Sequence, residues 1–579
     1  MASASAVIIT DIIALAPPWL FGRVVDSITS YVNHQYGFTA AVLISILTQL
    51  VVLFFCMELL RSLFRFLWRR LSQDTSRMIE FDLRYDLLNH LLKLSPKFFD
   101  NSKVGDLISR ASYDIEMIRM FLSMGIIIIA DVAAIVITTV PILFMLNPGL
   151  TAILCVPLPI FSVLAFRLIK KLSRESRAVQ DHTALLSADV QEIYSGSRVI
   201  KSYNREKAVG GKFEDLSQEN VVVNMNLART RALFICSITF VVMLIQAIVF
   251  WLGSRDVIFL GEDFTLGALT QYNMYVMWVA WPMAYLGWGI NNYQRAVASM
   301  ERLKEIMDTK PEIFDGPDVD PGITSIKGDI EFRHLTFSYD KNPVLNDISL
   351  KIPSGKTLAV VGRTGCGKST LVHLLVRLYN PPPNSIYIDG HELYTIPLET
   401  LRRRVGFVTQ EPLLFSQTIA ENIALADEDI PRERIYTAAR LASIHNEISE
   451  FPKGYETLLG ERGVNISGGQ KQRTTMARAL AGDPTILILD DALASVDTKT
   501  EDEILANLRE IRKGRTCIII SHRISSVKDA DIIVVIEQGR VAEMGNHEEL
   551  IKLGGYYFDL NRRQQLTQEL EKENGEGGQ

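Results

Sequence analysis

A run of glycines that ends in a lysine and a serine offers the clearest chemistry in this sequence of 579 residues. The run consists of Gly362, Arg363, Thr364, Gly365, Cys366, Gly367, Lys368 and Ser369, and Thr370 follows it. Glycines let successive backbone N–H groups turn inward around a phosphate, while the lysine reaches the outer phosphates of a nucleotide. The apolar stretch 358–361 and the helical pattern 370–378 predict a strand before the run and a helix after it. We therefore expect a P-loop, with the Ser369 hydroxyl available to Mg²⁺.

A carboxylate at the end of a second apolar strand supports this prediction. Residues 486–489 are all Ile or Leu, and Asp490 follows them. A carboxylate at the carboxyl edge of a strand can hold the Mg²⁺ shell of a bound nucleotide. A buried strand that ends in aspartate is common by itself, but its pairing with a P-loop predicts a nucleoside triphosphatase.

A third motif lies between these two and opens another predicted helix. It consists of Ser467, Gly468, Gly469 and Gln470. With the P-loop before it and Asp490 after it, this motif resembles the signature sequence of the ATP-binding cassette (ABC) transporter family. The resemblance implies that its backbone N–H groups and the Ser467 hydroxyl bind the γ-phosphate of ATP on a facing subunit. Ser467 also caps its helix, and this structural role does not compete with the functional one.

The remaining motifs of the family then follow in order. The resemblance implies that Tyr339 stacks on adenine, that Gln410 contacts Mg²⁺, that Asp497 belongs to the D-loop and that His522 is the switch histidine. Taken singly, such residues at strand ends are more often structural. Their order and spacing favour the functional interpretation, with ATP and Mg²⁺ as the cofactors.

One position departs from the family pattern. The resemblance implies a glutamate after Asp490 as the general base for the attacking water, but this chain has Asp491. Aspartate is one methylene shorter, which retracts the carboxylate by about 1.5 Å. A displacement of that size can cost on the order of 100-fold in rate. We expect this site to bind ATP and to hydrolyse it slowly.

This departure bears on the partner. In the family each ATP site pairs one subunit's P-loop with the other's signature, and here the signature is intact while the base is altered. The chain resembles the degenerate-site half of a heterodimeric exporter, whose second half-transporter supplies the competent base. A homodimer with two slow sites, or an altered residue introduced for study, remains the alternative.

The length of the chain predicts more than one domain, because a single hydrophobic core rarely exceeds roughly 250–300 residues. Hydrophobic residues make up 48% and charged residues 22%, with a net charge of −6 and five scattered cysteines. These values exclude a disordered chain and a secreted disulfide scaffold. The mildly acidic net charge gives no indication of nucleic-acid binding. We predict a multi-domain protein with an all-α transmembrane domain over 1–308, a linker over 309–325, a P-loop α/β nucleotide-binding domain over 326–565 and a flexible tail over 566–579.

Long apolar runs in the first half predict six membrane spans, each near the roughly 20 residues that cross hydrocarbon. They cover approximately 4–30, 38–68, 121–146, 149–171, 232–256 and 265–290. The long connections after the second and fourth spans are rich in Lys and Arg, so we expect them, and the nucleotide-binding domain, in the cytoplasm of a multi-pass protein of the cell membrane. Segments 104–110 and 196–203 resemble the family's coupling helices. No Lys or Arg precedes the first span, so we expect a clipped first helix or a missing lead-in.

Acidic and aromatic residues inside the spans are candidates for the substrate path. Charged side chains are costly there and usually face a cavity or a partner, so Asp131 and Glu58 could attract a cation. Tyr275 and Trp278 could face lipophilic cations, although pairing or helix packing explains all four residues equally well. We expect ATP-driven export of amphipathic drug-like compounds, with membrane lipid as a further partner. Lipid or peptide translocation, or an ATP-switched regulatory membrane protein, is the alternative.

Overall fold

The computed structural model describes residues 2–33, 39–155, 157–260, 264–340, 342–427, 429–460, 463, 465–493 and 498–576. The chain divides into two compact units, and each is described by itself. The first comprises Met1–Asn89 and Gly105–Asp308, and the second comprises His90–Val104 and Thr309–Gln579. The segment 90–104 therefore belongs to the second unit although it interrupts the first in sequence.

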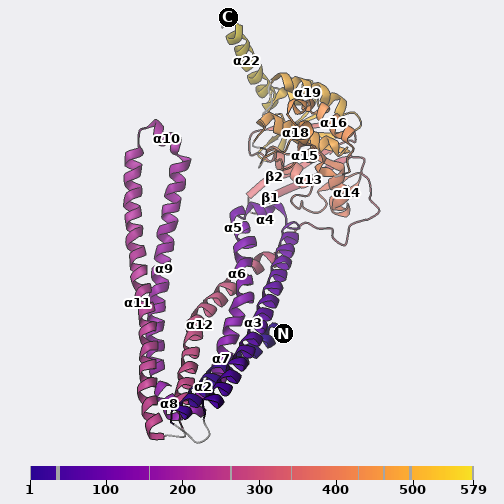
Figure 1. Cartoon of the computed structure of the whole chain (residues 1–579). Coiled ribbons are helices and arrows are strands. Elements are labelled where there is room, and N and C mark those ends of the chain that lie inside the picture. The colour runs from indigo at the N-terminus through magenta and orange to yellow at the C-terminus, as the bar shows by residue number, and fades with distance from the viewer. Residues whose placement is uncertain are drawn as a thin grey trace. The chain divides into compact units, whose positions relative to one another are not determined.

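The described part of the first unit is helical throughout (Figure 1). Helices suit a membrane domain because they satisfy every backbone polar group within one segment. The helices are α1 (Ala2–Ile13), α2 (Ala16–Val32), α3 (Ala40–Leu91), α5 (Val104–Ser109), α6 (Ile115–Met120), α7 (Ile126–Leu146), α8 (Pro148–Cys155), α9 (Pro157–Ser195), α10 (Ser197–Ser202), α11 (Glu206–Leu260) and α12 (Leu266–Met307). Two π-helical turns, Arg110–Asp114 and Phe121–Gly125, lie on either side of α6.

Among the described residues, four helical segments are long and apolar enough to cross a membrane. They are Ser5–Val32, Ala40–Leu91, Val104–Leu146 and Glu206–Phe259. They coincide with the first, second, third and fifth predicted spans. The fourth and sixth predicted spans fall on α8–α9 and α12, where side chains 157–166 and 280–287 lie outside the described residues. The helical transmembrane domain is confirmed, and the count of six spans stays a prediction.

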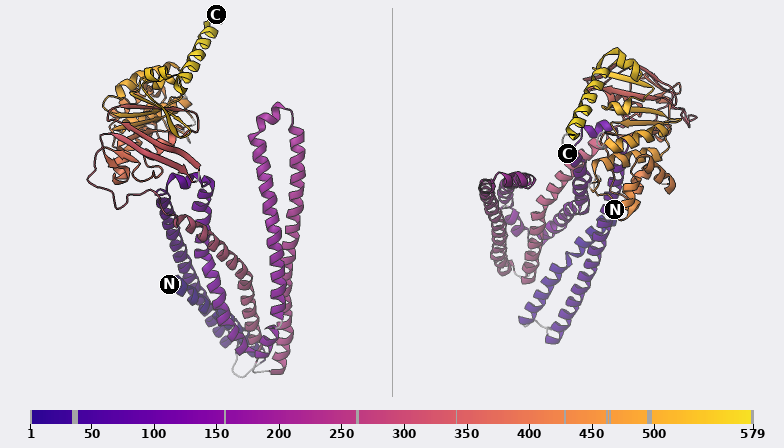
Figure 2. Two further views of the ribbon diagram at one scale, coloured as in Figure 1. Left: turned by 180° about the vertical axis from the view of Figure 1, so that it is seen from behind. Right: turned by 90° about the horizontal axis from the view of Figure 1, so that it is seen from above.

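Helices α9 and α11 lie side by side and are joined by α10, so that they form one long hairpin within the first unit (Figures 1 and 2). Lys212 on α11 pairs with Asp189 on α9 at 3.0 Å. Near the tip, Tyr194 and Tyr203 are 76% and 75% exposed. The α9–α11 hairpin therefore presents large aromatic side chains to its surroundings.

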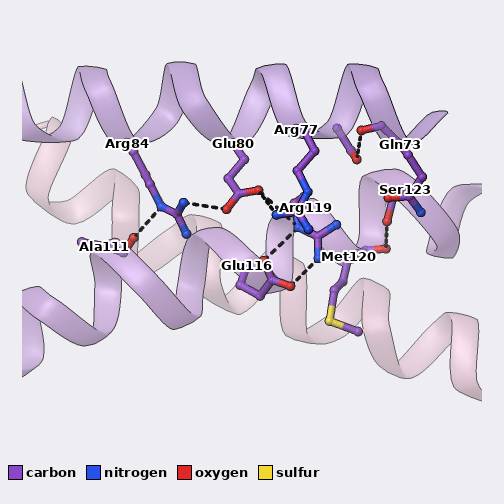
Figure 3. A network of polar contacts seen from close by, with 10 residues as sticks. Gln73, Arg77, Glu80, Arg84, Ala111, Glu116, Arg119, Met120 and Ser123 are labelled. Atoms are coloured by element: carbon purple, nitrogen blue, oxygen red, sulfur yellow. Dashed lines mark hydrogen bonds and ion pairs between the residues drawn. The ribbon is translucent and has the colours of Figure 1, made fainter. Parts of the chain in front are cut away.

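Polar contacts join the helices on either side of segment 90–104. On α3, the carboxylate of Glu80 is only 5% exposed and pairs with Arg77 at 2.8 Å and with Arg84 at 2.7 Å. Arg119 on α6 approaches the same carboxylate at 3.4 Å (Figure 3). Arg84 also donates to the backbone oxygen of Ala111 at 3.4 Å. One buried carboxylate thus ties α3 to α6.

A second buried carboxylate ties the same region to α12. Asp114 is 3% exposed and accepts hydrogen bonds from the Ser299 hydroxyl at 2.9 Å and from Arg302 Nε at 2.9 Å. A buried carboxylate is tolerated where donors satisfy its oxygens, as they do here.

The second unit contains two sheets. The larger has the order β10-β9-β3-β8-β7-β6 and is parallel except for β10, and the smaller has the antiparallel order β2-β1-β4-β5. The strands are β1 (Ile330–Tyr339), β2 (Asn342–Ile352), β3 (Thr357–Gly362), β4 (Ile386–Ile388), β5 (His391–Glu392), β6 (Val405–Val408), β7 (Ile486–Asp490), β8 (Thr516–Ile520), β9 (Ile532–Glu537) and β10 (Arg540–Gly545).

Alternate residues of the central strand β3 enter two different cores. Leu358 and Val360 pack on the face that carries the smaller sheet, whereas Ala359 and Val361 pack on the face covered by helices. A strand buried on both faces reads as a continuous apolar run, which explains the sequences of β3, β7 and β8. The prediction of a P-loop α/β domain is confirmed.

Most helices of the second unit pack around the larger sheet, whereas the C-terminal end of α22 projects away from it (Figures 1 and 2). They are α4 (Pro96–Asp100), α13 (Lys368–Leu375), α14 (Leu398–Arg404), α15 (Ile419–Ile423), α16 (Arg432–Leu441), α17 (His445–Glu450), α18 (Gly468–Ala481), α19 (Thr498–Ile511), α20 (Ile524–Val527), α21 (His547–Leu553) and α22 (Tyr556–Glu576). The sequence predicts a flexible tail over 566–579, but α22 continues to Glu576 because its Gln, Glu and Lys residues are good helix formers.

Candidate nucleotide site

The glycine-rich run forms the turn between β3 and α13. All three of its glycines have positive φ angles, which are 154° (Gly362), 83° (Gly365) and 101° (Gly367). A Cβ at Gly362 would lie 2.3 Å from the Ile536 oxygen, and one at Gly367 would lie 2.7 Å from a side-chain carbon. Other residues would strain the turn, which brings backbone N–H groups to the start of α13.

Lys368 and Thr370 begin α13 and are buried. The ammonium of Lys368 donates to the backbone oxygens of Gly362 at 3.0 Å and Arg363 at 2.9 Å. The helix starts at Lys368 and not at the predicted Thr370, since Gly367 is its N-cap. The positive charge thus lies inside the curve of the loop, where phosphates bind in P-loops.

Asp490 ends β7 beside the P-loop and is 3% exposed. Burial raises the pKa of Asp490, and a hydrogen bond with Ser369 opposes that rise. A buried carboxylate next to a hydroxyl is a hard oxygen pair of the kind that Mg²⁺ takes, together with phosphate oxygens and water. Asp490 and Ser369 therefore fit the metal.

Asp491 follows in the left-handed conformation, with φ of 48°. Its backbone N–H donates to the Ile520 oxygen at 2.9 Å, and its backbone oxygen accepts from Gln472 Nε2 at 2.9 Å. Asp491 is therefore fixed from both sides through its main chain. The reach of its carboxylate is therefore set by the side chain and not by movement of the backbone.

His522 lies just beyond β8, close enough to the P-loop to interact electrostatically with Lys368. Burial and then Lys368 lower the pKa of His522, while Asp491 and Asp490 act in the opposite direction. The backbone around His522 is held by Gln564 on α22. Gln564 Nε2 donates to the His522 oxygen at 2.6 Å, and Gln564 Oε1 accepts from the Ile524 N–H at 2.9 Å.

Two further predicted residues flank this centre. Tyr339 ends β1, and its hydroxyl lies 3.5 Å from the Thr370 hydroxyl, at the limit of a hydrogen bond. Gln410 follows β6 and is exposed. The structure thus brings Tyr339 to the P-loop helix and places Gln410 at the carboxyl edge of the larger sheet. Asp497 lies outside the described residues.

The Ser467–Gln470 motif forms the N-terminus of α18. The Ser467 hydroxyl accepts from the Gln470 N–H at 3.2 Å, and Gln470 Oε1 accepts from the Ser467 N–H at 2.9 Å, which is a capping box. Gln470 Nε2 also donates to Glu447 at 2.9 Å. Ser467 and Gly468 are exposed.

Glu58 and Asp131 both interact electrostatically with Arg65 on α3, whereas Tyr275 makes a packing contact. Glu58 pairs with Arg61 at 3.1 Å, and the Arg61 guanidinium lies 5.0 Å from the ring centre of Trp278. Tyr275 is 2% exposed and donates to the Leu15 backbone oxygen at 2.7 Å, which is a packing contact. Asp131 is half-buried on α7.

Sequence reasoning misses the residues that position the site. Gln472 lies two residues after the signature motif, so its place on the same helix is a usable signal. Gln564 lies in a polar helix without any motif, and only the fold brings it to His522. Residues that touch a ligand often belong to a motif, whereas the residues that position them often do not.

Together the fold and site define a membrane-embedded P-loop ATPase in one chain. Residues 1–283 match the ABC transporter transmembrane region, and residues 345–494 match the ABC transporter domain. The chain therefore belongs to the ABC transporter family. It binds ATP, and its family membership implies ATP hydrolysis coupled to transport.

Several relatives are similar along almost the whole chain. A probable multidrug resistance ABC transporter ATP-binding/permease protein, YheI of Bacillus subtilis, is 33% identical over 96% of this chain and 93% of its own. The multidrug resistance-like ATP-binding protein MdlA of Escherichia coli is 32% identical over 99% and 95%. An ATP-dependent lipid A-core flippase of Pseudomonas fluorescens is 36% identical over 83% and 79%.

A solved structure supports the same assignment. A bacterial Atm1-family ABC exporter with ATP bound matches with a TM-score of 0.79 and 26% identity, and the match covers 97% of each chain. The chain is thus a membrane protein with the ABC exporter fold.

Proposed function

We propose that this chain is one half of a heterodimeric ABC exporter, with ATP held at a hydrolysis-impaired site here and hydrolysed mainly at the partner's site. The observation that carries the proposal is the environment of Asp491. Its main chain is fixed by Ile520 and Gln472, so movement of the backbone does not replace the missing methylene. The elements that bind phosphate are complete.

We propose roles for the site residues that their resemblance to the family implies and that their positions support. Tyr339 stacks on adenine, the P-loop with Lys368 binds the phosphates, and the His522 ring contacts the outermost phosphate. The residues that hold Mg²⁺ are Ser369, Gln410 and Asp490. Magnesium would neutralise phosphate charge, while these side chains orient it. Asp497 is assigned to the D-loop by its sequence alone.

The signature acts on ATP of a second half-transporter. Ser467 and Gly468 are exposed at a helix N-terminus, where N–H groups and positive charge favour an anion. The exposed aromatic residues at the tip of the α9–α11 hairpin supply a further surface for a second chain. Because the signature is intact and Asp491 is altered, we favour a partner that differs from this chain and carries the competent base.

The cargo that we propose is an amphipathic or drug-like compound. Two of the relatives are named for multidrug resistance, and Asp131, Glu58 and Trp278 offer charge and aromatic surface within the helical unit. Lipid is the second candidate, favoured by the similarity to the lipid A-core flippase. We place the chain in the cell membrane with its nucleotide-binding domain in the cytoplasm.

One substitution tests whether the signature of this chain acts on the ATP bound by its partner. Ser467→Arg should lower the substrate-stimulated ATPase rate of the purified complex by more than about 100-fold, since it removes stabilisation of the partner's transition state. Ser449→Arg is the matched control because Ser449 is exposed on α17 of the same domain. Retained activity in Ser467→Arg would refute action in trans. Co-purification of a second copy of this chain alone would refute the heterodimer.

A further inference from the structure

Segment 90–104 brings a short helix of the intracellular connection into the nucleotide-binding unit. His90 Nε2 lies 3.0 Å from the Thr309 backbone oxygen, and Lys97 pairs with Glu312 at 3.3 Å. Both contacts lie within the second unit. The segment leads directly into 104–110, which resembles a coupling helix. The helix that it contributes is α4.

Tyr379 lies between this helix and the adenine-binding residue. It follows the P-loop helix α13, and its ring meets that of Tyr339 edge to face, with 5.0 Å between centroids and an interplanar angle of 84°. On its other side, the ring of His373 is 6.3 Å away and nearly parallel, at 29°. Aromatic pairs at such distances favour defined relative orientations.

The hydroxyl of Tyr379 donates a hydrogen bond to the carboxylate of Asp100, the last residue of α4. Burial raises the pKa of Tyr379 well above its usual value, so the hydroxyl keeps its proton throughout the physiological range. A hydrogen bond to an ionised acceptor is among the stronger kinds in proteins. The bond joins an exposed helix of the connection to a ring packed beside the nucleotide site.

A cavity of about 290 Å³ lies at the same place. Tyr339 and Tyr379 line one part of it, and Lys97, Asp100 and Asn101 line another. A base that occupies the face of Tyr339 restricts that ring, and the edge-to-face contact passes the restriction to Tyr379. The Tyr379 hydroxyl then turns away from Asp100 less often, so its hydrogen bond with Asp100 is formed more of the time.

We propose that Tyr379 is a positioning residue that connects occupancy of the adenine site to the order of α4 through its hydrogen bond with Asp100. The proposal rests on ATP binding at Tyr339, as proposed above. Through this one hydroxyl group, ATP binding would affect the connection that leads to the membrane domain of the same chain. Tyr379 touches neither phosphate nor the attacking water.

Hydrogen exchange of the full-length protein, purified with whatever chain accompanies it, tests this role. Adding ATP and Mg²⁺ should slow amide exchange in 96–103 in the native protein. In Tyr379→Phe the ring contacts remain and the hydroxyl is lost, so exchange in that segment with ATP should be roughly tenfold faster than in the native protein. Asp100→Ala should behave in the same way, and Asp100→Asn, which keeps an acceptor oxygen, should restore most of the protection.

Tyr394→Phe is the matched control. The Tyr394 hydroxyl donates to the Pro381 backbone oxygen at 2.6 Å, so this variant loses a similar bond that does not involve Asp100. The control should leave the ATP effect on 96–103 unchanged. Protection by ATP that persists in Tyr379→Phe would overturn the inference, and so would equal losses in Tyr379→Phe and Tyr394→Phe.

Nucleotide affinity separates this inference from the proposed function. A fluorescent ATP analogue should bind Tyr379→Phe within about threefold of the native affinity, because Tyr339 and the P-loop are untouched. A large loss of affinity together with unchanged exchange in 96–103 would overturn the inference by showing a purely structural role in the ATP site. Failure of the native protein to bind ATP would overturn both proposals, whereas ATP binding without protection of 96–103 would overturn only this one.

Discussion

Asp491→Glu should raise ATP hydrolysis at this site. The added methylene advances the carboxylate by about 1.5 Å. Because Ile520 and Gln472 fix the main chain at Asp491, this advance is not absorbed by a backbone shift. A correction of that size is expected to recover on the order of 100-fold in rate. This factor corresponds to about 2.7 kcal/mol of transition-state stabilisation.

A local cost accompanies the gain. Asp491 has a φ of 48°, a conformation that aspartate adopts more readily than glutamate. We expect Asp491→Glu to lower the free energy of unfolding by at most about 1 kcal/mol. Thermal unfolding of the detergent-solubilised protein measures this loss. It is small enough for activity to be compared at one temperature.

The assay is steady-state ATPase activity of the assembled complex whose partner site has been inactivated. Asp491→Glu should show the higher rate. Asp491→Asn keeps the side-chain length, removes the charge and should change the rate of the complex with an active partner site very little. Equal rates for Asp491→Glu and the native protein would show that the length of the Asp491 side chain does not limit hydrolysis. A loss of about 100-fold in Asp491→Asn with the active partner would show that Asp491 already serves as an effective base.

Three further predictions concern the helical unit and the surroundings of the nucleotide site. Glu80→Gln removes the charge that faces Arg119 and should destabilise the helical unit by about 3 kcal/mol, measured by thermal unfolding; an unchanged midpoint would contradict it. Gln564→Ala should lower ATP retention several-fold by releasing the His522 backbone, whereas the exposed neighbour variant Gln565→Ala should not, as nucleotide-trapping assays would show. Because burial lowers the pKa of His522 from 6.5, its ring stays neutral at pH 6.5 and protonates below it. The rate gained by the glutamate variant should therefore decline only below pH 6.5, and a midpoint above that value would contradict this assignment.

The amino-acid sequence predicts the parts of the site that depend on local chemistry. The glycines at 362, 365 and 367 are required by the turn itself, so their spacing is enough to identify the P-loop. The apolar run that ends at Asp490 likewise predicts a buried strand, since both faces of β7 are covered. Both features are read from a few consecutive residues.

Contacts between distant segments are harder to predict. Gln564 meets His522 because α22 returns to the carboxyl edge of the sheet, and Tyr379 meets Asp100 because segment 90–104 joins the second unit. Neither the polar helix nor the short segment has a pattern that specifies its partner. The register of such contacts follows from the packing of the whole unit, which propensity and periodicity do not encode.

ATP binding and ATP hydrolysis are separable at this site. The residues that bind ATP and the residue that activates water are held by different contacts. The P-loop is shaped by its glycines and by the packing of α13, and Lys368 bonds within that loop. Asp491 is held through main-chain bonds to Ile520 and Gln472. A change in the length of its side chain therefore alters none of the bonds that shape the P-loop. Such an arrangement lets one chain keep the affinity of an ATP site while its rate is set by a single methylene, which is the physical basis for expecting unequal sites in the assembled transporter.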